Sequence, residues 1–286
     1  MPYLAGMPPR GIKILAVLLV VLLLVAAGIL AWMAIRPPPR PAAPPPGAGA
    51  VPAPPAATPP AASRALGGPR YYAGQPAPAP GFSCKLTVLD NTGYSVGYCP
   101  DHKGPAWAAY RVFDNDVEQA PPWPAKFTDD PRVQGAPHSS DYTGMGYDCG
   151  HCAPNYVIAV CYGSEAQHDT FLMTNILPQR PVLNRHVWEG IERAEARNYR
   201  RKYGTLWVVD GPVYGEHPQR LPGGEVVPDK FFRIIVREVA QGEPVLLAYV
   251  VPQAVNGRES PAQFLVSVDH VEAETHLDFL RNLPDG

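Results

Sequence analysis

Residues 145–154, Met-Gly-Tyr-Asp-Cys-Gly-His-Cys-Ala-Pro, hold the densest group of reactive side chains in the chain. Cys149 and Cys152 have the Cys-x-x-Cys spacing of a redox dithiol. Asp148 and His151 are residue types that act as an acid and a base in hydrolysis. Two kinds of catalysis therefore compete for the same ten residues, and a metal site is a third possibility.

The dithiol interpretation requires a thiol whose pKa is lowered, usually at the N-terminus of a helix. Asp148 stands directly before Cys149, and its negative charge would raise the pKa of that thiol. Pro154 interrupts the helix that would have to follow, and no βαβ pattern surrounds the stretch. A thiol–disulfide oxidoreductase acting through Cys149 and Cys152 is therefore only the third hypothesis for function.

A structural zinc site would draw on the same cysteines. The spacing of Cys149 and Cys152 suits one half of such a site, and Cys161 is a further thiol. The other half has no matching Cys-x-x-Cys pair, and an oxidising compartment would compete for the thiols. The candidates for a fourth ligand are His138, His151 and His168.

Two longer stretches favour the acid–base chemistry. "DYTGMGYDCGHCAPNYVIA" and "TFLMTNILPQRPVLNRHVWEGIE" together resemble the DNA/RNA non-specific endonuclease family, the endonuclease G-like ββα-metal nucleases. The family pattern is Asp-Arg-Gly-His with a following Ala-Pro, then Thr/Ser-Asn-x-x-Pro-Gln, then an Asn that opens a helix carrying a Trp and a Glu. The matching residues here are Asp148, His151, Ala153-Pro154, Asn175, Pro178-Gln179, Asn184, Trp188 and Glu192. The resemblance extends over most of residues 82–286.

The resemblance implies roles for these residues that phosphodiester hydrolysis explains. Neutral His151 is the expected general base, because the reference pKa of histidine lies near 6.5. Asn184 is the expected ligand of Mg²⁺ (or Mn²⁺), and Glu192 would hold a metal-bound water from the same helix face. Asn175 would orient the base, and Asp148 belongs to the same catalytic motif. The simpler alternatives are a helix N-cap for Asn184, a solvated charge for Glu192 and a structural hydrogen bonder for His151.

Two motif arginines are missing. Cys149 replaces the Arg of Asp-Arg-Gly-His, and a second family Arg falls near Ala125. Each arginine in such a site binds two phosphate oxygens at once, so the loss of both arginines would slow catalysis. The alternative hypothesis is therefore a catalytically weak relative that binds nucleic acid at the cell envelope. His186 also replaces a small family residue. The candidates for the missing phosphate contacts are Lys126, Arg132, Arg185, Arg193 and Arg197.

The region from Phe82 onward has the composition of a globular domain, and its patterns predict an α+β fold. The apolar residues of 184–203 recur at helical spacing, and the segments rich in Val, Ile and aromatics at 204–215, 230–239, 243–252 and 262–271 are predicted strands. We therefore expect a ββα-metal nuclease fold with a central antiparallel sheet flanked by helices.

A hairpin is predicted near the start of this region. "CKLTVLDNTGYSVGYC" has two β-prone runs around the turn 90–93, so opposed residues should have numbers that add to 183. Cys84 and Cys99 would then face each other and form a disulfide, which suits an oxidising compartment. Two buried free thiols are the alternative.

The first 81 residues predict an anchor and a spacer. Residues 1–13 form a short stub, and 14–35 are 22 residues without a charge, enough to cross a bilayer. Residues 36–81 are Pro- and Ala-rich and predict an extended linker without a core. We therefore expect a single-pass protein of the bacterial inner membrane, with residues 82–286 on the periplasmic side. The lipid bilayer is then one of its partners.

Net charge is −2, so any recognition of nucleic acid must rest on local charge. The leading prediction is a membrane-anchored, Mg²⁺-dependent endonuclease that contacts the backbones of DNA and RNA without sequence preference. The sequence leaves the oligomeric state open.

Overall fold

The computed structural model describes residues 70–115, 120–124, 126–239 and 243–283. Its centre is an antiparallel sheet of seven strands in the order β10-β9-β8-β7-β4-β3-β2. Two further pairs, β1 with β11 and β5 with β6, are also antiparallel. The predicted α+β class with an antiparallel central sheet is therefore confirmed for the described residues.

The strands of the central sheet are β2 (Thr87–Asp90), β3 (Tyr94–Cys99), β4 (Gly104–Val112), β7 (Leu206–Val213), β8 (Lys230–Arg237), β9 (Val245–Pro252) and β10 (Leu265–Val266). The paired short strands are β1 (Ala77–Pro78), β5 (Asp148–His151), β6 (Ile176–Gln179) and β11 (Leu277–Asp278). The helices are η1 (Ser139–Tyr142), α3 (Asn155–Tyr162), α4 (Ser164–Asp169), η2 (Met173–Asn175), η3 (Leu183–Trp188), α5 (Glu189–Arg193), η4 (Ala194–Tyr199), α6 (Arg200–Tyr203), η5 (Pro261–Phe264) and α7 (Val268–Thr275).

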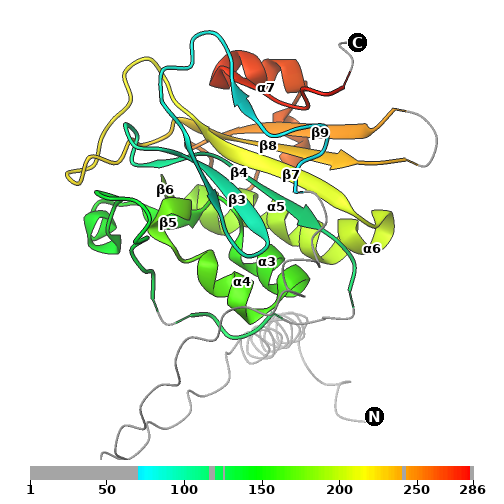
Figure 1. Cartoon of the computed structure of the whole chain (residues 1–286), viewed down its shortest axis with the longest axis horizontal. Helices are drawn as coiled ribbons and strands as arrows, with labels where there is room; N and C mark the ends of the chain where they lie inside the picture. Colours follow the sequence, from blue (N-terminus) through cyan, green and yellow to red (C-terminus); the bar gives the residue numbers. More distant parts are fainter. Residues whose placement is uncertain (1–69, 116–119, 125, 240–242, 284–286) are drawn as a thin grey trace, which may run out of the picture. The chain divides into compact units, whose positions relative to one another are not determined.

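The central strands β3, β4 and β8 are buried on both faces: helices α3 to α6 lie on one side of the sheet, and α7 lies on the other side together with the chain that follows Arg70 (Figure 1). Alternate residues of β8 show this division. Phe231 and Ile235 belong to the core that α3 and the continuous helix η3–α5–η4 complete, while Phe232 and Ile234 belong to the core on the side of α7. The period of two in a strand accounts for this division. The two-sided burial explains why these strands are continuous apolar runs in the sequence.

The predicted strands at 204–215, 230–239 and 243–252 correspond to β7, β8 and β9. The predicted strand at 262–271 is wrong in most of its length, because only Leu265–Val266 pair with β9. Ser267 caps a helix there by accepting a hydrogen bond from the His270 amide at 3.1 Å, and Asp269 lies in the first turn. Both features stabilise a helix N-terminus more than the β-prone side chains stabilise a strand.

The hairpin of β2 and β3 and its disulfide are present, but the register differs from the expected one. Opposed residues have numbers that add to 185, as in the pair Asp90 and Ser95, because the turn is the tighter Thr92-Gly93 with Gly93 at φ 86°. Cys84 precedes the first residue of β2 and reaches Cys99 from outside the ladder, with 5.9 Å between the Cα atoms. The predicted Cys84–Cys99 disulfide is confirmed, although cross-strand pairing is not its cause.

The last residues of the expected linker belong to the folded unit. Arg70 donates to Asp90 and Ser95, Tyr72 packs against the ring of Trp207, and Ala77–Pro78 pair with β11. The Pro- and Ala-rich composition of 36–81 did not predict these contacts, which involve Arg70, Tyr72 and the Ala77–Pro78 strand.

The predicted stub, anchor (14–35) and most of the linker lie outside the described residues. None of the helices within the described ranges has the length and apolar character of a membrane span.

Candidate active site

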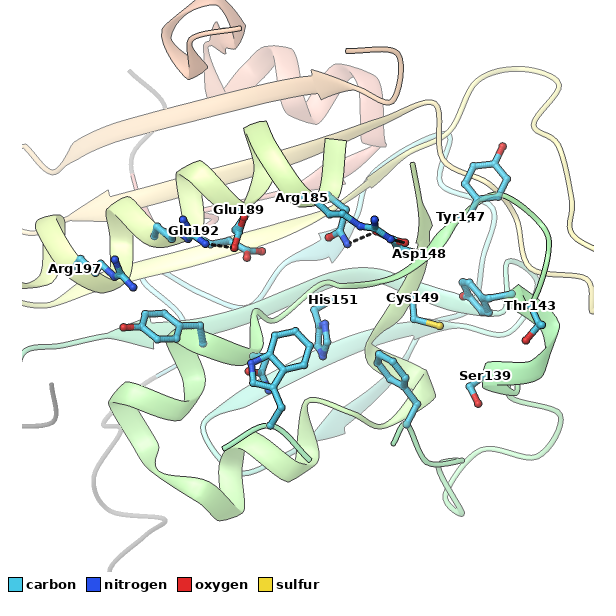
Figure 2. A pocket seen from close by; sticks show the side chains of 17 residues that line it. Ser139, Thr143, Tyr147, Asp148, Cys149, His151, Arg185, Glu189, Glu192 and Arg197 are labelled. Atoms are coloured by element: carbon cyan, nitrogen blue, oxygen red, sulfur yellow. Dashed lines mark hydrogen bonds and ion pairs between the residues drawn. The ribbon is translucent and has the colours of Figure 1, made fainter. Parts of the chain in front are cut away.

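A cleft of about 720 Å³ opens between β5 and the long helix formed by η3, α5 and η4. Figure 2 shows His151, Cys149 and Asp148 reaching it from β5, while Arg185, Glu189, Glu192 and Arg197 project from the helix. The predicted residues that line this cleft are Asp148, His151, Asn184, Arg185, Glu192, Arg193 and Arg197.

The strand β5 places the Asp-Cys-Gly-His motif. It pairs with β6 so that His151 lies opposite Ile176 and Gly150 opposite Leu177. A Cβ on Gly150 would come within 2.3 Å of the Gln179 side chain, so the motif requires glycine at this position. His151 and Cys149, two residues apart in the strand, project on the same side.

His151 is surrounded by aromatic rings. The ring centroids of Phe171, Phe127 and Trp123 lie 5.0, 5.5 and 6.4 Å from the imidazole centroid. Its Nε2 atom is buried without a hydrogen-bond partner in the protein. Burial lowers the pKa of His151 to about 4, so the imidazole is neutral at physiological pH and its unpartnered nitrogen can accept a proton.

Asp148 fixes the orientation of Asn184. Its Oδ2 atom accepts from Asn184 Nδ2 at 3.0 Å and from Arg185 Nε at 2.9 Å, and Oδ1 accepts from Arg185 at 2.7 Å. The amide nitrogen of Asn184 is thus directed at Asp148, which leaves the carbonyl oxygen of the same amide as an acceptor. Asp148 acts here on the position of two helix residues.

The helix itself departs from α geometry where it lines the cleft. Asn184 lies in η3, a π-helical segment, and Glu192 lies in α5, eight residues further along. Eight residues of pure α-helix make about 2.2 turns, which would rotate Glu192 past Asn184. The wider π turns bring eight residues closer to two whole turns, so both side chains face the same cleft.

Glu192 belongs to a buried group of charges around Arg233. The Arg233 guanidinium contacts Glu192 at 3.5 Å and Glu195 at 3.2 Å, forms an ion pair with Asp210, and lies over the Trp188 ring. Burial raises the pKa of Glu192 to about 8, of Glu195 to about 7 and of Asp210 to about 6, against the opposing effect of Arg233. One arginine cannot compensate two buried carboxylates and a third, Glu192, that is partly buried, so the group retains protons near neutral pH.

The predicted residue Asn175 does not line the cleft. It is fully buried, its Oδ1 accepts from the Ala153 amide at 2.9 Å, and its Nδ2 donates to the carbonyls of Ala153 and Thr170 at 3.0 Å. Its own carbonyl accepts from the Cys152 amide. The side chain therefore holds the backbone that directly follows His151.

The predicted cations are used differently from one another. Arg185 pairs with Asp148, Arg193 pairs with Glu189 at 2.5 Å, and Arg197 lies 5.5 Å from the Tyr156 ring, all within the cleft lining. Arg132 is not brought to the cleft, because it binds Asp130, Asn91 and the Asp90 carbonyl. Lys126 is exposed and is also not part of the lining.

His186, which replaces a small family residue, is exposed and is likewise not a lining residue. Its ring lies close to the backbone of Gly257, where an added Cβ would meet it at 3.0 Å.

The free cysteines do not support the other two readings of the motif. Cys149, Cys152 and Cys161 are unpaired, and burial raises the pKa of Cys149 and of Cys161 to about 11. The thiolate needed for disulfide exchange is therefore disfavoured. Among the described residues, the only group with metal-ligand spacing is Cys84, Cys99 and Asp101, and its two cysteines form the disulfide.

A hydrated divalent cation fits the helix side of the cleft. The carbonyl oxygen of Asn184 and the carboxylate of Glu192 are oxygen ligands, the type that hard cations prefer. Few protein ligands are offered, which suits a cation that keeps most of its waters.

Several lining or supporting residues have no counterpart in the sequence-based prediction. Asp210 and Arg233 lie opposite each other in β7 and β8, and a charged residue inside each of two apolar strands is the signal that marks them. Trp123 lines the cleft beside His151, but it lies in a Pro-rich stretch that has no recognisable motif.

The comparisons with known proteins agree with this geometry. The family model "DNA/RNA non-specific endonuclease" matches residues 74–286. Human mitochondrial endonuclease G is 30% identical over 161 residues, which cover 51% of this chain and 52% of the relative. Mitochondrial nuclease 1 of Schizosaccharomyces pombe is 33% identical over 165 residues, which cover 51% and 50%.

A solved structure of an EndoG/EndoGI complex has the same fold, with a TM-score of 0.62 at 23% identity over 71% of this chain and 89% of that chain. The chain therefore belongs to the DNA/RNA non-specific endonuclease family. It spans about half the length of these two curated relatives.

The predicted location is not upheld. The human and fission-yeast relatives are named as mitochondrial nucleases, and no helix within the described ranges has the length and apolarity of a membrane span. The names of these relatives contradict the predicted bacterial inner-membrane location with the catalytic domain on the periplasmic side, while the predicted anchor itself (14–35) lies outside the described residues.

Proposed function

We propose that this chain is a metal-dependent endonuclease that hydrolyses phosphodiester bonds of DNA and RNA without sequence preference. The observation that supports it most is a neutral histidine with an unpartnered nitrogen, His151, in one cleft with Asn184 and Glu192. The function is assigned to the region that the family model matches, residues 74–286.

In this proposal His151 accepts the proton of the attacking water, and its aromatic surroundings disfavour the charged imidazolium, so the imidazole is neutral when the water binds. Asn175 and the β5–β6 pairing keep the imidazole in place. Asp148 orients the Asn184 amide, and Arg233 holds Glu192 at the cleft wall.

The proposed cofactor is Mg²⁺, with Mn²⁺ as a substitute, held by Asn184 and, through water, by Glu192. When bound, such a cation supplies Lewis-acid stabilisation of charge on the phosphate oxygens.

The test is plasmid nicking by the full chain with Mg²⁺ or Mn²⁺ and with EDTA. Replacing His151→Ala should lower the metal-dependent rate by about 10²- to 10⁴-fold, the usual contribution of a general base. The matched control is His168→Ala, an exposed histidine outside the cleft lining, which should leave the rate unchanged. A His151→Ala rate equal to that of the wild type would contradict the proposal.

The second candidate function is binding of nucleic acid with little cleavage. It is favoured by Cys149, which lines the cleft at the position of the motif arginine and has a neutral thiol there. Well-folded chain that binds labelled DNA but does not cut it with either cation would support this candidate and exclude the first.

A further inference from the structure

The most exposed large apolar side chain of the described residues lies in the cleft. Trp123 is 68% exposed, whereas the next, Val245, is 51% exposed and lies elsewhere. An exposed indole offers a ligand a large flat apolar face together with a polar N–H group, and here it stands beside the candidate base.

The indole of Trp123 is held in place by its neighbours. Its centroid lies 5.8 Å from that of Phe171 and 6.4 Å from that of His151, and both contacts are edge-to-face with interplanar angles of 78° and 76°. Neither ring is stacked parallel to the indole. A flat aromatic surface therefore stands next to the nitrogen base, within the reach of a nucleotide whose phosphate lies at His151.

The charges of the cleft are nearly balanced. Its lining contains three acids, Asp148, Glu189 and Glu192, and three arginines, of which Arg185 and Arg193 are already paired with acids. A protein that binds duplex DNA through its backbone commonly neutralises several phosphates with unpaired cations. This cleft, in a chain of net charge −2, offers little attraction of that kind.

Stacking can replace the missing electrostatic attraction only if a base is accessible. In a duplex each base is stacked and paired, so contact with an indole beside the backbone requires that the base be flipped out. In a single strand the bases are already free to stack on aromatic side chains, and every base has a suitable face.

We propose that the cleft acts on unpaired stretches of nucleic acid, and that the base next to the scissile phosphate stacks on Trp123. This inference rests on the proposed nuclease function and defines its substrate class. In this proposal, stacking on Trp123 supplies the part of the affinity for nucleic acid that phosphate-binding arginines would otherwise supply.

The first test compares cleavage of a non-self-complementary DNA 20-mer alone and annealed to its complement, using the full chain with Mg²⁺. Wild type should cut the single strand faster than the duplex. Trp123→Ala should lower kcat/KM on the single strand by about 5- to 150-fold, as expected for loss of one base–aromatic stack, and change duplex cleavage less than about twofold. Trp123→Phe should retain most of the activity.

Leu265→Ala is the matched control, because Leu265 is an exposed large apolar residue outside the cleft lining. It should leave both rates unchanged. Equal losses on single strand and duplex in Trp123→Ala, or a wild type that cuts the duplex at least as fast as the single strand, would overturn the proposal.

The second test measures binding without cleavage. In EDTA, adding the unlabelled single strand should quench tryptophan fluorescence, and the quenching should disappear in Trp123→Phe although four of the five tryptophans remain. Quenching without any metal-dependent cleavage would contradict the nuclease function and leave the stacking site intact. Cleavage without Trp123-dependent quenching would contradict the stacking site alone.

Discussion

On the β5 side of the cleft, His151 lies among aromatic rings, whereas on the helix side the charged residues are arranged in pairs and around one buried arginine. The first environment lowers the pKa of His151 to about 4 and keeps it uncharged. The second raises the pKa of Glu192 to about 8, because burial outweighs the opposing effect of Arg233, which is shared with two other carboxylates. Burial is thus the largest cause of both pKa shifts, which have opposite directions for the base and the acid and favour the neutral form of each.

The comparison also shows where the stability of the site comes from. The base is held by backbone pairing in β5–β6 and by the buried amide of Asn175. Ion pairs hold the helix side. The Arg233–Glu195 pair is buried, whereas the Arg185–Asp148 pair is partly exposed.

Arg233→Met breaks the helix side most severely. It leaves Glu192, Glu195 and Asp210 without their shared cation, and we expect the free energy of unfolding to fall by about 3–5 kcal/mol. Urea denaturation of the full chain measures this. A loss below about 1 kcal/mol would mean that Arg233 contributes little to the stability of this group.

The pH dependence of stability tests the same group without a mutation. The folded-state pKa values of Glu195 and Glu192, about 7 and 8, lie above the unfolded value of 4.5, so their stabilising effect is complete below pH 4.5 and is lost as pH rises toward 8. Glu195→Gln should flatten the fall in urea midpoint between pH 5 and 8. An unchanged slope in that variant would contradict the raised pKa values.

Titration of the histidines by NMR tests the β5 side. His151 should remain neutral to about pH 4, because its pKa is lowered by burial, while exposed His138 should titrate above the usual 6.5, because Asp129 stabilises its charged form at 2.8 Å. The two histidines serve as controls for each other, and His151→Ala assigns the first signal. A His151 signal that titrates near 6.5 would show that the aromatic surroundings are open to water.

Asn175→Ala removes the amide that holds the backbone behind His151. We expect a loss of about 1–3 kcal/mol in the free energy of unfolding, because the Ala153 amide and two carbonyls lose their buried partner. The control is Asn282→Ala, an exposed asparagine, which should change little. Equal urea midpoints for the two variants would argue against a positioning role.

Arg185→Met should have the smallest effect on stability. The guanidinium side chain is 65% exposed, and exposed ion pairs contribute little because water and salt screen them. We expect a melting temperature close to that of the wild type, measured by circular dichroism. A large fall would mean that the Asp148–Arg185 pair supports β5, in addition to orienting Asn184.

Much of the site was predictable because its residues belong to two short sequence motifs. His151, Asp148, Asn184 and Glu192 come from one strand motif and one amphipathic helix, and all four line the cleft. Arg132 was not predictable as a structural residue, since its partners Asn91 and the Asp90 carbonyl are 41 and 42 residues away. Asn175 matched the motif equally well, but only its burial shows that it contacts backbone and not the cleft.

The sequence by itself determined the α+β class, the strands β7 to β9 and the helix of Asn184 and Glu192, because local periodicity and motif spacing carry this information. Only the tertiary structure decided the protonation of His151 and the sharing of Arg233 among three carboxylates, since both depend on burial by segments distant in the chain. The same is true of Trp123, which becomes a possible binding surface for a base only because the fold brings it to His151.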